Sequence, residues 1–308
     1  SVTFRDTDRF SSLRARFDAG KTRLQLDGRA SDILRGSAAK GQVRVEGPSL
    51  AALRPFIDAP FPASKPYEID AELTKEKTEY AFARVKAEIG ETDISGELTY
   101  EPRQPRPLLK ATLRSKVGHY ADLASLAGLV EKGEGAAAAS QEKAGAKSAK
   151  KAPPPAKQAA AAGTQAVWQE ARLFSSRSWK SERLRSFDTQ FEFRVERLEV
   201  PRFEALESLR AEGRLEDGAL SLDPLELGLA GGRASGRFEL DARRSPAQGR
   251  LHLKLRGAHL ERLLAKLPEQ KRLAGLLEAD LRLQGQGDSL AALLGQASGR
   301  LEAHLDEG

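Results

Sequence analysis

The sequence predicts a mainly β fold of the α+β class, with a long, mainly antiparallel sheet, short helices at the strand ends and two related halves. Three observations predict it: apolar and charged residues alternate, turn signals separate the alternating segments, and the pattern repeats internally. The alternation is clearest in the segments 191–195 (FEFRV), 225–229 (LELGL), 251–256 (LHLKLR), 281–284 (LRLQ) and 43–46 (VRVE). Successive side chains of a strand point to opposite faces, so each segment has one apolar and one charged face.

Turn signals join these segments by short connections. Glu216, Asp217 and Gly218 form a typical hairpin signal, residues 231–232 are two glycines, and residues 245–249 read SPAQG. Connections of this length leave no room for helical crossovers between the strands that they join. The sequence therefore predicts a meander of neighbouring strands.

Helical spacing of apolar residues occurs in four short segments: 48–53, 119–126, 258–267 and 288–295. Pro268 interrupts the third of these. In the fourth, Asp288 and Ser289 are candidate N-caps. Each segment lies beside a predicted strand, so we expect short helices at strand ends.

The internal repeat aligns residues 94–123 with residues 234–263 without gaps, at an offset of 140 residues. Six of the thirty positions are identical, at Ser95, Gly96, Arg103, Leu113, His119 and Leu123 and their partners. The shared order of strand, turn, strand and helix predicts that the two halves are structural repeats.

The net charge of +6 comes from 50 Lys and Arg against 44 Asp and Glu, and it is unevenly distributed. Residues 131–165 carry six Lys against three Glu, which is half of the net charge, and they lack aromatic and branched apolar side chains. Such a segment buries too little surface to fold alone, so we predict a linker or long surface loop. A basic tether to anionic lipid or cell wall is the alternative. The predicted division is 1–130, first β segment; 131–165, linker; 166–308, second β segment.

Several motifs resemble those of the AsmA family. They are 215–225 (LEDGALSLDPL), 229–236 (LAGGRASG), 281–290 (LRLQGQGDSL), 299–308 (GRLEAHLDEG), 45–53 (VEGPSLAAL) and the segment 96–123. They cover most of the chain outside 131–165. Because they are short and rich in Gly and Leu, they specify an architecture more than an activity.

The resemblance implies a bacterial envelope protein with a periplasmic body anchored in the inner membrane. The chain begins with Ser1 and contains no Met, and the usual N-terminal anchor is missing, so we expect a fragment of a longer protein. The body would be a curved β-groove that carries phospholipid or another envelope lipid towards the outer membrane. Other envelope proteins are further expected partners, and nucleic acid is not. The alternative is a non-catalytic structural or regulatory scaffold that binds proteins through its sheet edges.

The sequence predicts no catalytic site, metal site or cofactor. The absence of Cys excludes disulfides, thiolate metal sites and Cys nucleophiles. The motif Gly-Asp-Ser-Leu at 287–290 is also found in lipase-like hydrolases, but the chain lacks their Asp-x-x-His, so helix capping is the favoured interpretation. Neither the four His (His119, His252, His259 and His304) nor the glycines at 231–236 have the spacing of metal ligands or of a phosphate loop.

An aromatic segment follows the predicted linker, and core packing is favoured over an interfacial membrane contact for its residues Trp168, Phe174, Trp179, Leu184 and Phe187. The predicted groove residues are the apolar members of the alternating segments. In the second half they are Leu220, Leu222, Leu225, Leu227, Leu229, Phe238, Leu240, Leu251, Leu253, Leu255, Leu281 and Leu283, with first-half equivalents Phe82, Val85, Leu98 and Tyr100.

Overall fold

The structure is a computed structural model that describes residues 2–7, 10–31, 38–53, 63–126, 181–200, 206–264 and 274–306. The predicted linker 131–165, Trp168, Phe174, Trp179 and Leu267 lie outside the described residues.

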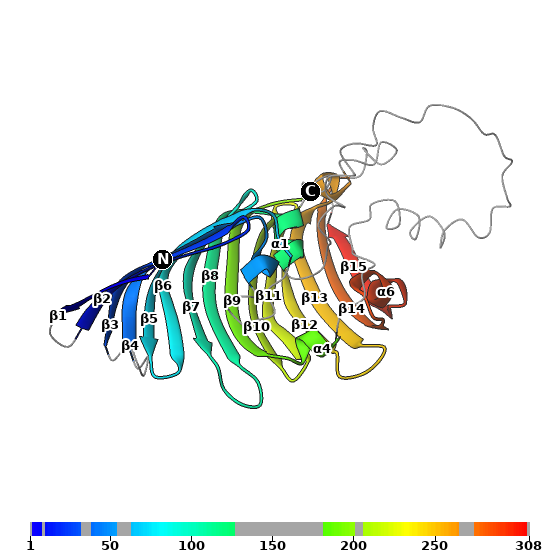
Figure 1. The fold of residues 1–308 in the computed structure, drawn as a ribbon. Helices are drawn as coiled ribbons and strands as arrows, with labels where there is room; N and C mark the ends of the chain where they lie inside the picture. The colour runs from blue at the N-terminus through cyan, green and yellow to red at the C-terminus, as the bar shows by residue number, and fades with distance from the viewer. Residues whose placement is uncertain are drawn as a thin grey trace, which may run out of the picture.

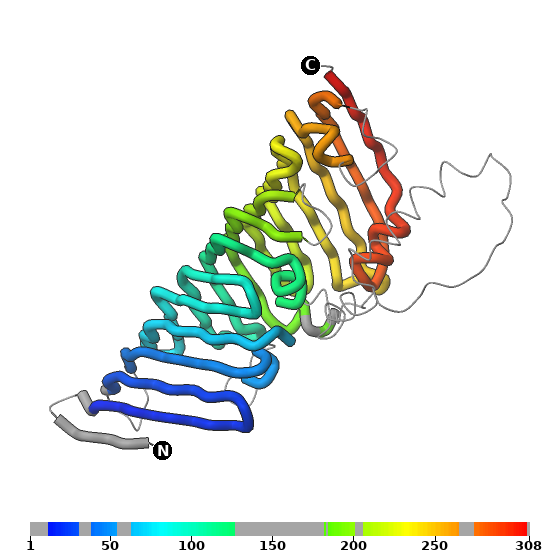
Figure 2. The backbone as a smooth tube through the Cα atoms, turned by 90° about the horizontal axis from the view of Figure 1, so that it is seen from above, coloured from blue at the N-terminus to red at the C-terminus, as the bar shows by residue number. Residues whose placement is uncertain are grey.

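One sheet of fifteen strands dominates the described part of the chain, and its strands lie in chain order. Figures 1 and 2 show it as a single long, twisted layer. Its strands are β1 (Val2–Thr7), β2 (Phe10–Ala19), β3 (Thr22–Ser31), β4 (Ala38–Gly47), β5 (Tyr67–Glu76), β6 (Glu79–Ile89), β7 (Thr92–Glu101), β8 (Leu108–His119), β9 (Asp188–Glu199), β10 (Leu206–Glu216), β11 (Ala219–Leu229), β12 (Gly232–Asp241), β13 (Gln248–His259), β14 (Leu276–Gln286) and β15 (Ser298–Asp306). The predicted mainly β, mainly antiparallel fold is confirmed.

The helices are short and lie beside strand ends, as predicted. They are η1 (Leu50–Leu53, a 3-10 helix), α1 (Tyr120–Leu126), α4 (Ser181–Leu184), α5 (Leu260–Leu263) and α6 (Leu290–Gly295). Among the described residues, no helix has the length and apolar character needed to cross a bilayer.

The junction between β8 and β9 was not predicted. These strands pair in parallel, whereas every other neighbouring pair of described strands is antiparallel. A parallel pair needs a long connection, and here the chain leaves β8 through α1 and returns through α4. The alternation within a strand is the same for both pairing directions, so it could not reveal this pair.

The internal repeat has the same strand bounds in both halves. The strands β6, β7 and β8 begin and end 140 residues before β11, β12 and β13, and α1 begins 140 residues before α5. A β-bulge between Phe82 and Val85 in β6 has its equivalent between Leu222 and Leu225 in β11. The two halves therefore share both strand order and a local irregularity.

The buried core is divided among clusters under the helices. One cluster lies under η1 and α1 and contains Leu50, Leu53, Tyr67 and Ile89. A second surrounds Leu293 of α6, and a third joins α5 to the ends of the neighbouring strands. All of these helices therefore pack on the same, apolar side of the sheet.

Candidate functional site

The candidate site is the apolar face of the sheet. Directly paired residues of neighbouring strands share a face, so the register shows which side chains line up across the sheet. One row of apolar or glycine residues crosses fourteen strands through Leu13, Gly28, Gly41, Leu73, Phe82, Leu98, Ala111, Phe191, Gly213, Leu222, Phe238, Leu251, Leu283 and Gly299. The apolar stripe is therefore continuous through both halves.

A second row runs beside the first from β6 to β15. Its members are Val85, Gly96, Leu113, Phe193, Ala211, Leu225, Gly236, Leu253, Leu281 and Leu301. The sequence prediction missed several members of the two rows, including Leu73, Leu113, Phe191, Phe193 and Leu301. The alternation at 191–195 could have identified Phe191 and Phe193.

The bulges keep this face apolar along each strand. The leucines of β11 occupy even positions up to Leu222 and odd positions from Leu225 onwards. A regular strand would turn one of the two sets to the charged face. The register shift between Leu222 and Leu225 absorbs the extra residue, and the shift between Phe82 and Val85 does so in β6.

Exposure shows that the described residues cover this face only in part. Of the sixteen predicted groove residues, Leu240 is buried at 5% exposure, and the other fifteen are intermediate. Side chains under a second layer would be fully buried, and an isolated strand would leave them exposed. Intermediate exposure fits a bent single layer whose side chains shield one another.

The helices form two borders along this face. The first border consists of η1, α1 and α5, which lie where β4, β8 and β13 end, and the second consists of α4 and α6, which lie where β9 begins and β14 ends. Figure 1 shows the strands bending around the side that carries these helices. The middle of the apolar face lies between the two borders, and we call this strip of the sheet the trough.

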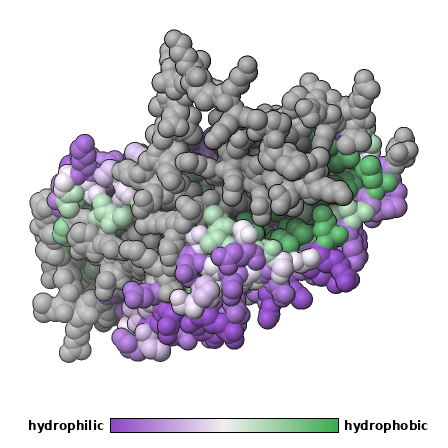
Figure 3. Space-filling view, turned by 90° about the vertical axis from the view of Figure 1, so that its right-hand side faces the viewer, coloured by the Kyte–Doolittle hydropathy of each residue, from purple (hydrophilic) through white to green (hydrophobic). Residues whose placement is uncertain are grey.

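The opposite face is charged. On β12 and β13, Arg237, Glu239, Arg250 and Lys254 are all exposed. Figure 3, which views the molecule from the side of α6 and β15, shows a green hydrophobic band next to the purple hydrophilic surface. The two faces of the same strands thus differ sharply in polarity.

Glycines allow the strands to bend where the second row crosses them. A Cβ atom on Gly236 would lie 1.8 Å from the carbonyl oxygen of His252, and one on Gly96 would lie 2.0 Å from that of Thr112. Both glycines pair with the residue that follows a bulge, Leu225 and Val85. Bulge and glycine therefore coincide at the bend of each half.

A buried carboxylate fastens α1 at the first border. Asp122 is 1% exposed and accepts hydrogen bonds from the Glu91 amide and the Thr92 hydroxyl. Lys65 Nζ lies 2.9 Å from Asp122 Oδ1, and the Thr92 hydroxyl also accepts from the His119 amide. This network joins α1, β8 and the turn before β7. In the second half, Arg262 occupies the position equivalent to Asp122 and pairs with Glu207 at 2.5 Å.

A second ionic cluster holds the two halves together beside the parallel pair. Asp188, at the start of β9, lies 2.9 Å from both Arg103 and Arg106, and Arg106 also contacts Asp217 at 3.1 Å. Burial raises the pKa of Asp188, but hydrogen bonds from the Asp217 amide and the two arginines outweigh it and lower the pKa. The carboxylate therefore remains charged at neutral pH.

The motif at 287–290 has a capping role, as predicted. Ser289 is the N-cap of α6, and its side chain accepts a hydrogen bond from the Ala292 amide.

His119 and His259 lie where β8 and β13 meet their helices. Within the described residues, no three His, Asp or Glu side chains are grouped as a metal site. Leu184 packs against the core around Leu293, and Phe187 is half-buried.

A long open sheet with one apolar and one charged face, built from repeats, defines a class of extended β proteins. This chain belongs to the AsmA family, whose model matches residues 67–308. It is 27% identical over 301 residues to the AsmA family protein YhjG of Escherichia coli (strain K12), covering 96% of this chain and 41% of that relative. The chain thus spans less than half of that relative's length. The comparison with solved structures gives no match. Family membership suggests an envelope-related function, and AsmA family proteins are not known as enzymes.

Proposed function

We propose that this protein is a bridge-like lipid-transfer protein of the bacterial envelope that carries phospholipid acyl chains along the trough without catalysing a reaction. The observation that carries the proposal is the unbroken apolar row from Leu13 on β2 to Gly299 on β15. Strands lie about 4.8 Å apart, so fifteen of them span on the order of 65 Å. A continuous path of that length serves transport better than a closed binding pocket would.

The energetic argument concerns the cost of moving a lipid through water. Exposing one CH₂ group costs about 0.8 kcal/mol, so a 16-carbon chain costs on the order of 12 kcal/mol. A trough of half-buried side chains lowers this barrier along its whole length. Its open side lets the charged headgroup stay in water while the acyl chain lies on the sheet.

The proposed location is the periplasm, with the body anchored in the inner membrane by a segment outside this chain and lipid moving between the inner and outer membranes. Family membership supports this proposal. The proposed partner is phospholipid or another envelope lipid.

The test is native mass spectrometry of the protein purified without added detergent. We expect co-purified phospholipid, and we expect Leu253→Asp to reduce it, because this change places a charge in the second row. Ser95→Asp, on the charged face opposite Lys86 and Arg114, is the matched control and should retain the lipid. A wild-type protein that carries no lipid, or equal losses in the two variants, would refute the proposal.

A scaffold role is the second candidate, and the edge strand β15 favours it. All nine residues of β15 are exposed, Leu301 at 64% and Leu305 at 39%. Its outer edge has no partner strand among the described residues. An added strand from another protein would pair with this edge. Pull-down partners that are lost on Leu301→Lys, from a protein that carries no lipid, would favour this role.

A further inference from the structure

The charged face of β12–β15 carries a row of three arginines and one histidine. The row consists of Arg237, His252, Arg282 and Arg300, each directly opposite the next in the register. We call it the cationic row. Like charges directly opposite each other destabilise a sheet, so the direct pairing of Arg282 with Arg300 is an unfavourable arrangement for the sheet alone.

The carboxylates around the cationic row neutralise it only in part. Asp280 lies 3.2 Å from His252 and 3.1 Å from Arg282, and Glu302 lies 3.5 Å from Arg300. The Arg237 side chain has no ion pair or hydrogen bond with any other described residue. The positive charge is therefore least compensated at the β12 end of the row.

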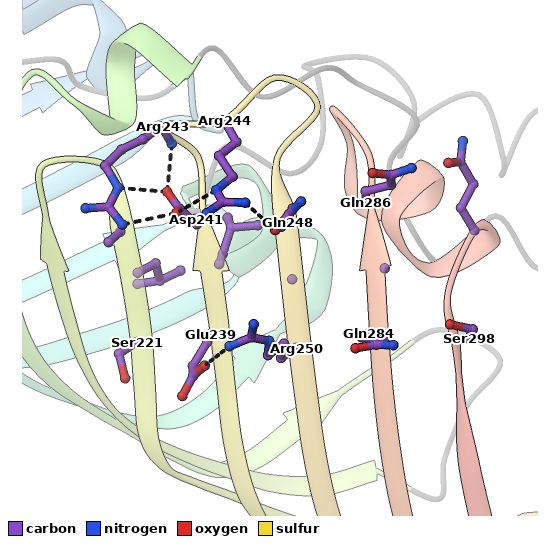
Figure 4. A pocket seen from close by; sticks show the side chains of 16 residues that line it. Ser221, Glu239, Asp241, Arg243, Arg244, Gln248, Arg250, Gln284, Gln286 and Ser298 are labelled. Carbon is purple, nitrogen blue, oxygen red and sulfur yellow. Dashed lines mark hydrogen bonds and ion pairs between the residues drawn. The ribbon is translucent and has the colours of Figure 1, made fainter.

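The cationic row lines a shallow crevice of about 750 Å³, which also contains Glu239 and Arg250 and the neutral hydrogen-bonding groups of Gln284 and Ser298. Figure 4 shows the next row, in which Glu239, Arg250, Gln284 and Ser298 lie at one level across β12–β15. Glu239 lies 3.8 Å from Arg250, so this neighbouring row of the charged face is ionically complementary at that point. The positive charge of the crevice that is not balanced by a carboxylate therefore lies in the cationic row.

We propose that this crevice binds an anion with two or more phosphate groups. A guanidinium donates two parallel hydrogen bonds to phosphate oxygens, and a phosphate has enough oxygens to bridge cations on adjacent strands. Neighbouring members of the row are about 4.8 Å apart, so the row matches several anionic groups better than one. The site lies on the face opposite the trough, so it is independent of acyl chains bound there.

The phosphate groups have two possible sources, a soluble oligophosphate and the headgroups of an anionic membrane. The first arm titrates the protein with sodium tripolyphosphate by calorimetry at low ionic strength, where screening is weak. The second arm measures binding to vesicles of phosphatidylglycerol and of phosphatidylcholine. We expect one or both phosphate probes to bind, and phosphatidylcholine vesicles to bind less than phosphatidylglycerol vesicles.

The key variant combines Arg237→Gln with Arg300→Gln, and Arg44→Gln is its control. Arg44 is also exposed on the charged face, where it pairs with Glu68. We expect the double variant to lose about tenfold in affinity for whichever probe binds, and the control to bind like the wild type. Bound tripolyphosphate should also raise the Tm of the wild type more than that of the double variant.

Three results would overturn the proposal: neither phosphate probe binds, the double variant binds as tightly as the wild type, or an oligoglutamate of equal charge binds as tightly as the phosphate probe. Circular dichroism of each variant checks that the sheet remains folded. Both substituted arginines are exposed, so their replacement leaves the buried clusters intact.

Discussion

At the scale of single residues, a few buried polar groups determine how the helices are held on the sheet. Asp122 is the clearest case, because its carboxylate accepts hydrogen bonds from two groups at the β6–β7 turn and contacts Lys65. Asp122 lies in α1, and its contacts hold this helix at the border of the trough. Its environment depends on the folded structure, and the sequence pattern gave no indication of its role.

Replacing Asp122 by Ala should lower the free energy of unfolding by about 2–3 kcal/mol, because the Thr92 hydroxyl and the Glu91 amide lose their acceptor. Denaturant unfolding measures this loss. Asp122→Asn keeps an acceptor oxygen and should lose less. Equal stability of Asp122→Ala and the wild type would mean that the network does not hold α1.

Tyr67 should make the protein sensitive to alkaline pH. Burial raises its pKa to about 12, and the nearby Thr22 side chain only partly offsets this. A raised pKa in the folded state stabilises the protein below the unfolded pKa of about 10, and this stabilisation is lost as the pH rises to about 12. Tyr67→Phe should therefore lose less stability than the wild type between pH 10 and 12, as measured by urea unfolding. Identical pH profiles would contradict the assignment.

At the scale of the elements, bulges keep the apolar side chains of β6 and β11 on one face of the curved sheet. The period-two pattern predicted the strands and their faces because each strand is apolar on one side only. It did not predict the bulge between Leu222 and Leu225, although the change of phase in the leucines is visible in the sequence. Nor did it predict the parallel pair of β8 and β9, because pairing direction depends on the route of the connection.

Gly236→Ala tests the bend. The added Cβ would lie 1.8 Å from the His252 carbonyl oxygen, so the backbone must shift, and we expect a loss of about 1–3 kcal/mol in thermal or chemical unfolding. Gly295→Ala in α6 is the matched control, because its Cβ would meet nothing within 4 Å. That control should be neutral or slightly stabilising. A neutral Gly236→Ala would show that the strand does not need glycine there.

At the scale of the whole molecule, two repeats and their neighbours join into one sheet with a continuous apolar face. The 140-residue offset was visible in the sequence because strand, turn and helix signals recur in the same order. The predicted groove residues lie in neighbouring rows on this face, as the register shows for Phe82, Leu98, Leu222, Phe238 and Leu251. Their partial exposure could not be predicted, because alternation describes a covered sheet and an open one equally well.

The most direct test of the trough is site-specific photo-crosslinking to lipid. A benzophenone amino acid placed at Leu253 or Leu281 lies on the apolar face, and the same amino acid at Lys254 or Glu278 lies on the charged face of the same strands, outside the cationic row. We expect phospholipid adducts, detected by mass spectrometry, at the two leucine positions and few at the two charged positions. Adducts of equal yield on both faces, or none at the leucine positions, would contradict the account.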